Sequence, residues 1–255
     1  MSLYLNRSFY SALALALFAS CPWAFGQEDE EAAENPSNPL SKSRNTDLRA
    51  QYFDLGDNAD RSSYNVEGAT MLNSQLKLKY EARYWSTNVT GKREHGMEAA
   101  SLKAIYFPKD RQLSDEWGVR PAIGLEWIID FDNVDKGIGG GSDILSPFLG
   151  LAFAHSSGLS LVPLVQHFTE YSGNKVKLTA FRLIGIQPLD GGYWLKLDAK
   201  VPIDWENDRA IPASAEFQLG RMFSPGLGGY IDAFAGMGSD RPYDWGLGLG
   251  LRFVY

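Results

Sequence analysis

Apolar and charged residues alternate along several segments of the chain. The clearest is QLKLKYEARYWST, residues 75–87, in which the even positions from Leu76 to Tyr84 are apolar or aromatic and most odd positions are charged. Residues 119–132 and 193–206 show the same alternation. A period of two predicts strands with one apolar and one polar face, whereas a helix would scatter the charges around its circumference. Each predicted strand matches the roughly 9 to 11 residues that cross a membrane at a tilt.

Turn-forming clusters divide residues 45–255 into about twelve such segments. We therefore predict an all-β fold, an antiparallel up-and-down transmembrane β-barrel of about 12 strands. The predicted strands have their centres near Ala50, Gly68, Tyr80, Lys103, Leu125, Leu149, Val165, Phe181, Ala199, Phe217, Ala233 and Leu249.

The connections support this topology. An even number of strands places both ends of the barrel on the periplasmic side, where turns are short, and leaves longer loops outside. HSSG at 155–158 and LDGG at 189–192 fit the short class, and KDRQLSDEWG at 109–118 is a longer exception. On the outer side we expect longer, charged loops, among them GDNADRSS at 56–63 and NVDKGIGGGSD at 133–143.

The final strand, WGLGLGLRFVY, carries large apolar residues at every second position and ends on an aromatic residue. It resembles the insertion signal of Gram-negative outer-membrane barrels, which the barrel assembly machinery reads. On this resemblance the signal consists of Leu249, Leu251, Phe253 and Tyr255, which face lipid. The strand must pair with the first one, residues 46–55, because an open edge in hydrocarbon would leave unsatisfied amides.

The N-terminus predicts export. Residues 1–26 have a charged start with Arg7, an apolar run at 9–20 and the small residues Ala24 and Gly26 on either side of Phe25. This is the layout of a signal peptide, with cleavage expected after Gly26. Cys21 is the only cysteine, so the mature chain has neither a disulfide nor a thiolate site. A membrane anchor and an acylated Cys21 are the alternatives. Residues 27–44 form an acidic tail that we expect to be disordered, with a plug or a partner-binding arm as the alternative.

Composition narrows the class of protein. Aromatic residues make up 13% of the 255 residues, Gly numbers 26 and the net charge is -7, which argues against a nucleic-acid partner. The remaining alternatives are an exported soluble β-sandwich or lipocalin-like barrel, and the membrane barrel. We expect the bacterial outer membrane as the location, with contacts to lipid and lipopolysaccharide. Aromatic girdles at the interfaces are expected from Tyr84, Trp127, Trp205, Trp245 and Tyr255.

A second resemblance covers about the last 75 residues. It is carried by Gln187 with Pro188, Gly192 before Tyr193 and Trp194, Asp204 with Trp205, Pro212, Gly220 with Arg221, Pro242, Trp245 and Arg252. In these positions the chain is similar to the outer-membrane family named after a meta-cleavage pathway of phenol degradation. The resemblance implies a transporter-like barrel, and a hydrophobic or aromatic solute follows only from the family name.

The polar faces of the strands are expected to line the lumen. The residues predicted there are Lys77, Lys79, Glu81, Arg83, Lys103, Arg120, Glu126, Asp130, Lys196, Asp198, Lys200, Asp204, Glu206, Glu216 and Arg252. A barrel of this size has room for a narrow passage or for a lumen filled by ion pairs. The function predicted is a channel or transporter for small solutes, and the alternative is a non-conducting structural or surface-interaction barrel. The acids Glu126, Asp130, Asp204 and Glu206 would favour cationic or polar solutes at the outer mouths.

Catalytic and metal sites are weaker hypotheses. His155 and Ser157 in the HSSG turn, with Glu170 downstream, have a spacing found in barrel lipid hydrolases, but such enzymes act on the outer leaflet and this turn is expected to be periplasmic. We therefore expect no enzyme. Asp132, Asp135 and Asp143 do not have the spacing of an EF-hand loop, so no metal or other cofactor is expected.

Overall fold

The computed structural model describes residues 35–255. The predicted signal peptide, its cleavage after Gly26, Cys21 and the acidic residues 28–34 lie outside the described residues. Within the part that is described, no helix is long and apolar enough to span a membrane.

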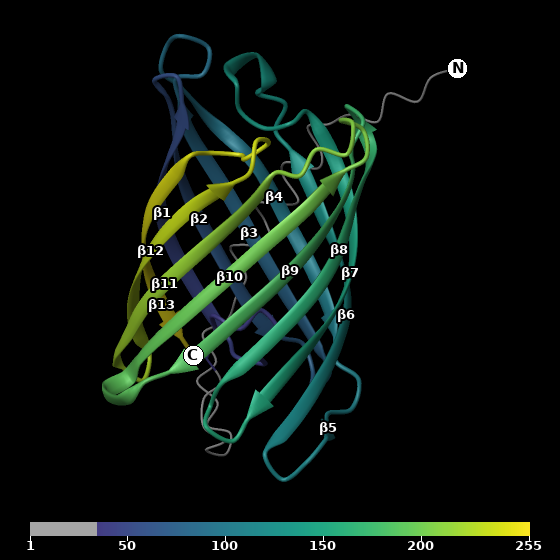
Figure 1. Ribbon diagram of the computed structural model, residues 1–255, viewed down its shortest axis with the longest axis vertical. Coiled ribbons are helices and arrows are strands. Elements are labelled where there is room, and N and C mark those ends of the chain that lie inside the picture. The colour runs from purple at the N-terminus through teal and green to yellow at the C-terminus, as the bar shows by residue number, and fades with distance from the viewer. Residues whose placement is uncertain (1–34) are drawn as a thin grey trace. The chain divides into compact units, whose positions relative to one another are not determined.

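Twelve long antiparallel strands form one closed barrel, which confirms the predicted fold (Figure 1). Every predicted strand centre falls inside one of them. A short strand, β5 (Arg111–Gln112), pairs only with the start of β6. The long strands are β1 (Asn45–Gly56), β2 (Ala59–Met71), β3 (Leu76–Thr87), β4 (Glu94–Tyr106), β6 (Trp117–Asp130), β7 (Ser142–His155), β8 (Ser160–Gly173), β9 (Lys177–Pro188), β10 (Tyr193–Asp204), β11 (Ala213–Ser224), β12 (Leu227–Met237) and β13 (Trp245–Val254).

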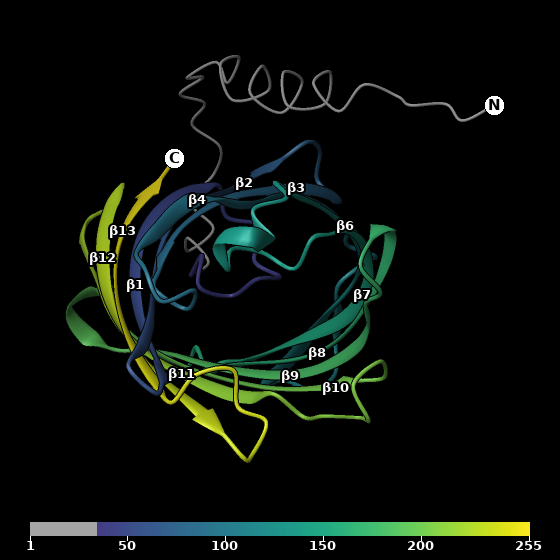
Figure 2. The ribbon, with the colours of Figure 1, turned by 90° about the horizontal axis from the view of Figure 1, so that it is seen from above.

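The ring closes between the first and last strands. β1 pairs with β13 in an unbroken register from Asn45↔Val254 to Asp54↔Trp245. Figure 2 shows these two strands side by side in the closed outline. Closure leaves no open strand edge on this ring, which is the condition for a sheet to lie in hydrocarbon.

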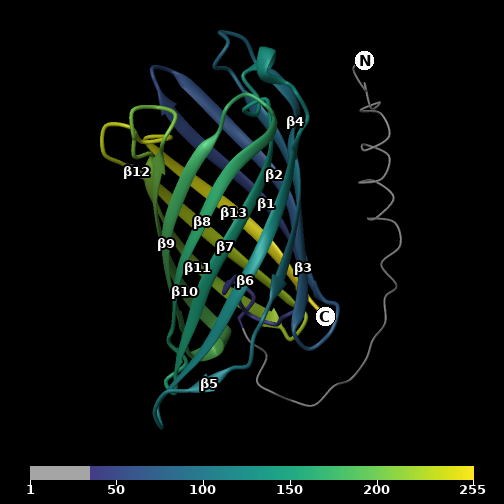
Figure 3. The same cartoon turned by 90° about the vertical axis from the view of Figure 1, so that its right-hand side faces the viewer.

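Both ends of the barrel chain lie at the same end of the ring, which we call the terminal end, and the opposite end is the loop end. Turns at the terminal end are short except for the segment with β5, which extends beyond the barrel (Figure 3). The expected long loop at 56–63 is instead a tight turn at Asp57–Asn58. Both turn residues have positive φ values, 51° and 61°, the conformation of a hairpin turn that Asp and Asn tolerate, so the strands continue almost to its tip.

The two faces of each strand meet different surroundings. Along β13, Leu247, Leu249 and Leu251 are 56%, 63% and 49% exposed on the outer surface, whereas the inward-facing Arg252 is 4% exposed. The girdle residues predicted from the sequence are all exposed as well. A soluble barrel would turn these apolar faces inward. The apolar outer surface is therefore the kind that lies against lipid.

Apolar side chains fill the terminal end of the lumen. The described N-terminal residues, 35–44, lie outside any strand until β1 begins, and Leu40 is 1% exposed. This part of the chain belongs to the region expected to be a disordered tail. We call the apolar cluster around it the base cluster: Leu40, Ile105, Phe107, Ala122, Ala152, Val162, Ile184 and Ile186.

Candidate functional site: the barrel lumen

The lumen wall begins at the closing seam. Arg252 of β13 lies opposite Asp47 of β1 and donates to its carboxylate at 2.6, 3.0 and 3.1 Å. Tyr230 donates to the same carboxylate at 3.0 Å, and Arg252 also donates to the Ser37 hydroxyl at 2.7 Å. The buried ion pair therefore joins the first strand, the last strand and the N-terminal segment.

The glycines of β13 make room for these side chains. A Cβ at Gly250 would lie 2.1 Å from the Tyr230 ring, and one at Gly246 would lie 2.6 Å from the Phe53 ring. The alternating glycines are thus the positions over which large lumenal side chains pack. This agrees with the expectation from the sequence that small residues face a crowded lumen.

A charge network continues from the seam across β10, β11 and β12. Arg49 contacts Glu67 at 3.4 Å, Glu216 at 3.3 Å and Asp232 at 3.0 Å. Lys196 contacts Glu216 at 2.8 Å. At the end of the network, the Nε of Arg182 donates to Asp198 at 2.7 Å. Every carboxylate of this wall has at least one cationic partner.

The opposite wall holds a second set of pairs. Arg83 of β3 donates through two nitrogens to Glu98, and it lies 3.4 Å from Glu81. Lys103 of β4 contacts Glu126 of β6 at 2.8 Å, and Gln166 donates to the same carboxylate at 2.7 Å. Glu126 is therefore bound inside the wall and is not a free acid at an outer mouth.

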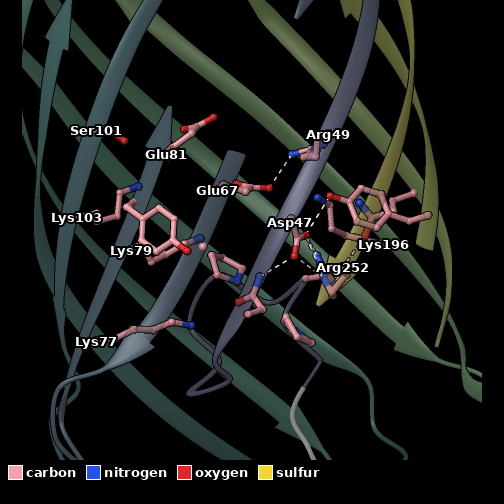
Figure 4. Close-up of a pocket in the computed structure, with 18 of the residues that line it drawn as sticks. Asp47, Arg49, Glu67, Lys77, Lys79, Glu81, Ser101, Lys103, Lys196 and Arg252 are labelled. Atoms are coloured by element: carbon pink, nitrogen blue, oxygen red, sulfur yellow. Dashed lines mark hydrogen bonds and ion pairs between the residues drawn. The ribbon is translucent and has the colours of Figure 1, made fainter. Parts of the chain in front are cut away.

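A cavity of about 240 Å³ remains between the two walls (Figure 4). Its lining contains seven cationic side chains and four carboxylates, an excess of three positive charges. The seven cations are Arg49, Lys77, Lys79, Lys103, Arg182, Lys196 and Arg252, and the four acids are Asp47, Glu67, Glu81 and Glu126. Seven of the residues predicted to line the lumen also line this cavity: Lys77, Lys79, Glu81, Lys103, Glu126, Lys196 and Arg252.

The other predicted lumen residues lie outside this lining. Arg83, Asp198 and Glu216 belong to the networks of the walls, and Lys200 faces inward, 5.8 Å from the Phe168 ring. Arg120 binds Asp110 at the terminal end and donates to the Leu40 carbonyl at 3.4 Å.

Three predicted acids lie at the loop end. Asp130 accepts hydrogen bonds from the backbone N–H groups of Asp132, Gly140 and Gly141, so it folds its own loop. Asp204 accepts from Glu206 and Asn207 in the turn after β10. Glu206 does not lie on a lumenal strand face, because β10 ends at Asp204, and its side chain is exposed in that turn. These acids therefore do not gather at one constriction that would select for cations.

The N-terminal segment is fixed in the terminal end of the lumen by polar contacts as well as by Leu40. Lys77 donates to the Ser41 carbonyl at 2.6 Å, and Ser37 donates to Gln218 at 2.8 Å. Ser41 is fully buried. The segment occupies the position of a plug beneath the cavity.

The loop end of the lumen is narrowed by aromatic side chains and by one loop. Arg61 lies between the rings of Phe53 and Trp85, at 4.8 and 4.3 Å, and Tyr243 packs 4.8 Å from Phe53. The loop between β6 and β7 contains η1 (Val134–Lys136), the teal coil that lies inside the ring outline in Figure 2. A cavity thus remains between a plug below and a narrowed mouth above.

Several lining residues were not predicted from the sequence, among them Asp47, Arg49, Glu67 and Arg182. The signal was present in β1, where Asp47 and Arg49 alternate with Leu48 and Ala50. Arg182 is an isolated charge in an apolar strand, so periodicity alone did not reveal it. No pattern in the sequence indicated that Ser37 and Leu40 fold into the lumen.

The candidate hydrolase residues do form contacts. The Ser157 hydroxyl lies 2.8 Å from Nδ1 of His155, and Nε2 of His155 lies 3.5 Å from Glu116 instead of the expected Glu170. The backbone N–H of Ser157 donates to the same Nδ1 at 3.1 Å, which is a local turn contact. This turn is exposed at the terminal end, away from the loop end where the hypothesis required it. Within residues 35–255, no group of three or more potential ligands could hold a metal ion.

Comparisons with known proteins agree with the fold. Neither a protein-family model nor a curated protein matches the chain, so the phenol-degradation family is not confirmed. Among solved structures, an outer-membrane channel from Pseudomonas putida F1 is similar, with 9% identity and a TM-score of 0.63 over 90% of this chain and all of that one. The NanC porin has 12% identity and a TM-score of 0.58, over 82% and 98% of the two chains. The KdgM porin has 10% identity and a TM-score of 0.54, over 83% and 99%. The chain has the fold of outer-membrane β-barrel channels.

Proposed function

We propose that the protein is a non-enzymatic channel or transporter of the bacterial outer membrane that passes small polar solutes. The observation that carries the proposal is the polar cavity enclosed by the barrel wall, because a barrel that served only as a structural element would not need to keep such a space. The apolar outer surface and the likeness in fold to the three channels support the membrane location.

The cavity favours polar over apolar solutes. Its lining is dominated by charged side chains, so a hydrophobic or aromatic solute would separate these charges from water without replacing their hydrogen bonds. The apolar side chains at the terminal end of the lumen belong to the base cluster, where they already pack against Leu40. One structure of the KdgM porin is described as a complex with disordered oligogalacturonate, so a channel of this fold can take a charged, polar solute.

The test is single-channel current through the full chain, purified from outer membranes and placed in a planar bilayer. We expect discrete current steps. Lys200→Glu should move the ion selectivity toward cations and Asp198→Lys toward anions, because both side chains face the lumen. Lys109→Glu, in an exposed turn at the terminal end, is the control and should change selectivity far less.

A barrel that shows the heat-modifiable migration of a folded protein but never conducts would support the alternative, a closed structural or surface-interaction barrel. Equal shifts for Lys200→Glu and Lys109→Glu would show that the current does not pass the lumenal charges.

A further inference from the structure

Two pairs of cations stand directly opposite each other on neighbouring strands. Lys79 of β3 is in register with Lys103 of β4, and Lys200 of β10 is in register with Arg182 of β9. All four side chains are on the lumenal face. Like charges directly opposite each other destabilise a sheet, so these two pairs require compensation.

The like-charged pairs of carboxylates in the lumen are all neutralised by contacts with cations. Glu67 is in register with Glu81, and Asp198 with Glu216. Arg49 lies 3.4 Å from Glu67, Arg83 lies 3.4 Å from Glu81, and Lys196 lies 2.8 Å from Glu216. Asp198 is held by Arg182. No carboxylate of these pairs lacks a cation.

The cation pairs are compensated at only one member each. Lys103 contacts Glu126, and Arg182 contacts Asp198. For the other members, Lys79 and Lys200, no carboxylate oxygen of residues 35–255 lies within 4.0 Å.

The acids whose charges act on the two lysines already pair with other cations. For Lys79 these acids are Glu67 and Glu81, which form ion pairs with Arg49 and Arg83. For Lys200 the acid is Asp198, which forms an ion pair with Arg182. The wall therefore leaves two lumenal ammonium groups without a bound counter-charge from the described part of the chain.

Both pairs of cations border the same cavity. Lys103 is the cross-strand partner of Lys79, Arg182 is that of Lys200, and both partners line the same cavity. Three of the four cations line the cavity, which Lys79 enters from the β3 side in Figure 4. Lys200 lies outside this lining, on the lumenal face of β10 beside Arg182, and its side chain is exposed.

We propose that Lys79 and Lys200, with Lys103 and Arg182 beside them, bind the oxyanion group of a small anionic solute in the middle of the lumen. This inference rests on the proposed channel function and specifies its substrate class. Ammonium groups donate short, charge-assisted hydrogen bonds to carboxylate and phosphate oxygens, and both groups share this chemistry. The cavity of about 240 Å³ is below the size that drug-like ligands occupy, which suits a solute of one sugar ring or smaller.

The test is calorimetric titration of the folded full chain in detergent with three sugars that share one ring and differ in the group at C6: glucose, glucuronate and glucose 6-phosphate. We expect the two anions to bind and glucose not to bind. The carboxylate and the phosphate arms show which oxyanion is preferred. Equal heats for glucose and glucuronate would overturn the inference without any variant.

A pair of double variants locates the site. Lys79→Gln with Lys200→Gln should weaken binding of the anions about tenfold or more, because each lost ammonium removes a charge-assisted hydrogen bond. Lys79→Arg with Lys200→Arg should retain binding. The control, Lys109→Gln with Lys175→Gln, removes the same charge from exposed turns and should bind as the unchanged chain does. Unchanged affinity in the lumenal glutamine variant would overturn the assignment of these lysines.

The binding experiment and the conduction experiment test the two proposals independently. Anion binding that depends on Lys79 and Lys200 in a barrel without current would uphold the site and refute the channel. Current without anion binding would uphold the channel and refute the site.

Discussion

The base of the lumen and its middle are filled in opposite ways. At the base, Leu40 packs among apolar side chains of β4, β6, β7, β8 and β9. In the middle, charged side chains form networks along both walls and leave a cavity between them. Apolar packing fills space to close contact, whereas ion pairs are directional and attach side chains to the wall. The comparison shows how one barrel can be closed at one level and remain open at another.

The largest effect is expected in the charged middle. Arg252→Met removes one partner of a buried ion pair and leaves Asp47 without its guanidinium. Breaking such a pair costs about 3–5 kcal/mol. We expect a loss of that order in the free energy of unfolding, measured by urea titration of the barrel in lipid vesicles.

The double replacement of Arg252 and Asp47 by Met and Leu sharpens this prediction. Because the cost arises from the isolated carboxylate, removing both partners should recover much of the lost stability. A double variant as unstable as Arg252→Met would show that the ion pair is not the source.

A smaller effect is expected at the base. Leu40→Ala leaves a hole in the base cluster, and large-to-small changes in a packed core cost about 2–5 kcal/mol when the site cannot collapse. This change loosens the N-terminal segment in particular. Hydrogen exchange at the amides of Ser37, Asn38, Leu40 and Ser41 should therefore accelerate while the strands of the barrel stay protected. Leu113→Ala, in an exposed turn, is the control and should leave this exchange unchanged.

If the strands also lost protection from hydrogen exchange in Leu40→Ala, the base cluster would stabilise the barrel itself and not only the N-terminal segment. The measured current should also rise in Leu40→Ala if the segment limits the passage.

The smallest effect is expected at a glycine. Gly250→Ala places a Cβ 2.1 Å from the Tyr230 ring and displaces the hydroxyl that donates to Asp47, and such overpacking costs about 1–3 kcal/mol. At Gly185 the nearest side-chain atom to a new Cβ, from Leu161, would lie 3.7 Å away, which is ordinary contact, so Gly185→Ala is the matched control. Equal unfolding free energies for both variants would show that the β13 glycines are not needed for lumenal packing.

The sequence revealed the fold because the pattern that defines it is local. Alternation along each strand fixes which face meets lipid, as Leu249 and Arg252 show, and turn residues fix the number of strands. The candidate site was only partly predictable. Alternation placed Lys79 and Lys200 on the inner face, but their neighbours depend on register and on contacts across the ring, such as Arg49 with Glu216, 167 positions apart.

The N-terminal segment was the least predictable part. Its residues, rich in Pro, Ser and Asn, have the composition of a solvated tail, and the contacts that hold Ser37 come from Gln218 and Arg252, at the far end of the chain. Local composition cannot report such distant partners. The tight turn at Asp57–Asn58 was predicted wrongly for a different reason. Polar residues in a turn and polar residues on the inner face of the adjoining strands look alike in the sequence, so both were assigned to one long loop.

The seam pair has a consequence for the order of assembly. Arg252 lies on the last strand, β13, and it contacts both Asp47 on the first strand and Ser37 in the N-terminal segment. Backbone pairing of β1 with β13 closes the ring, and the same pairing brings this guanidinium to the position from which it reaches the segment. The segment can therefore take its place in the lumen, with this contact made, only after the two strands have paired.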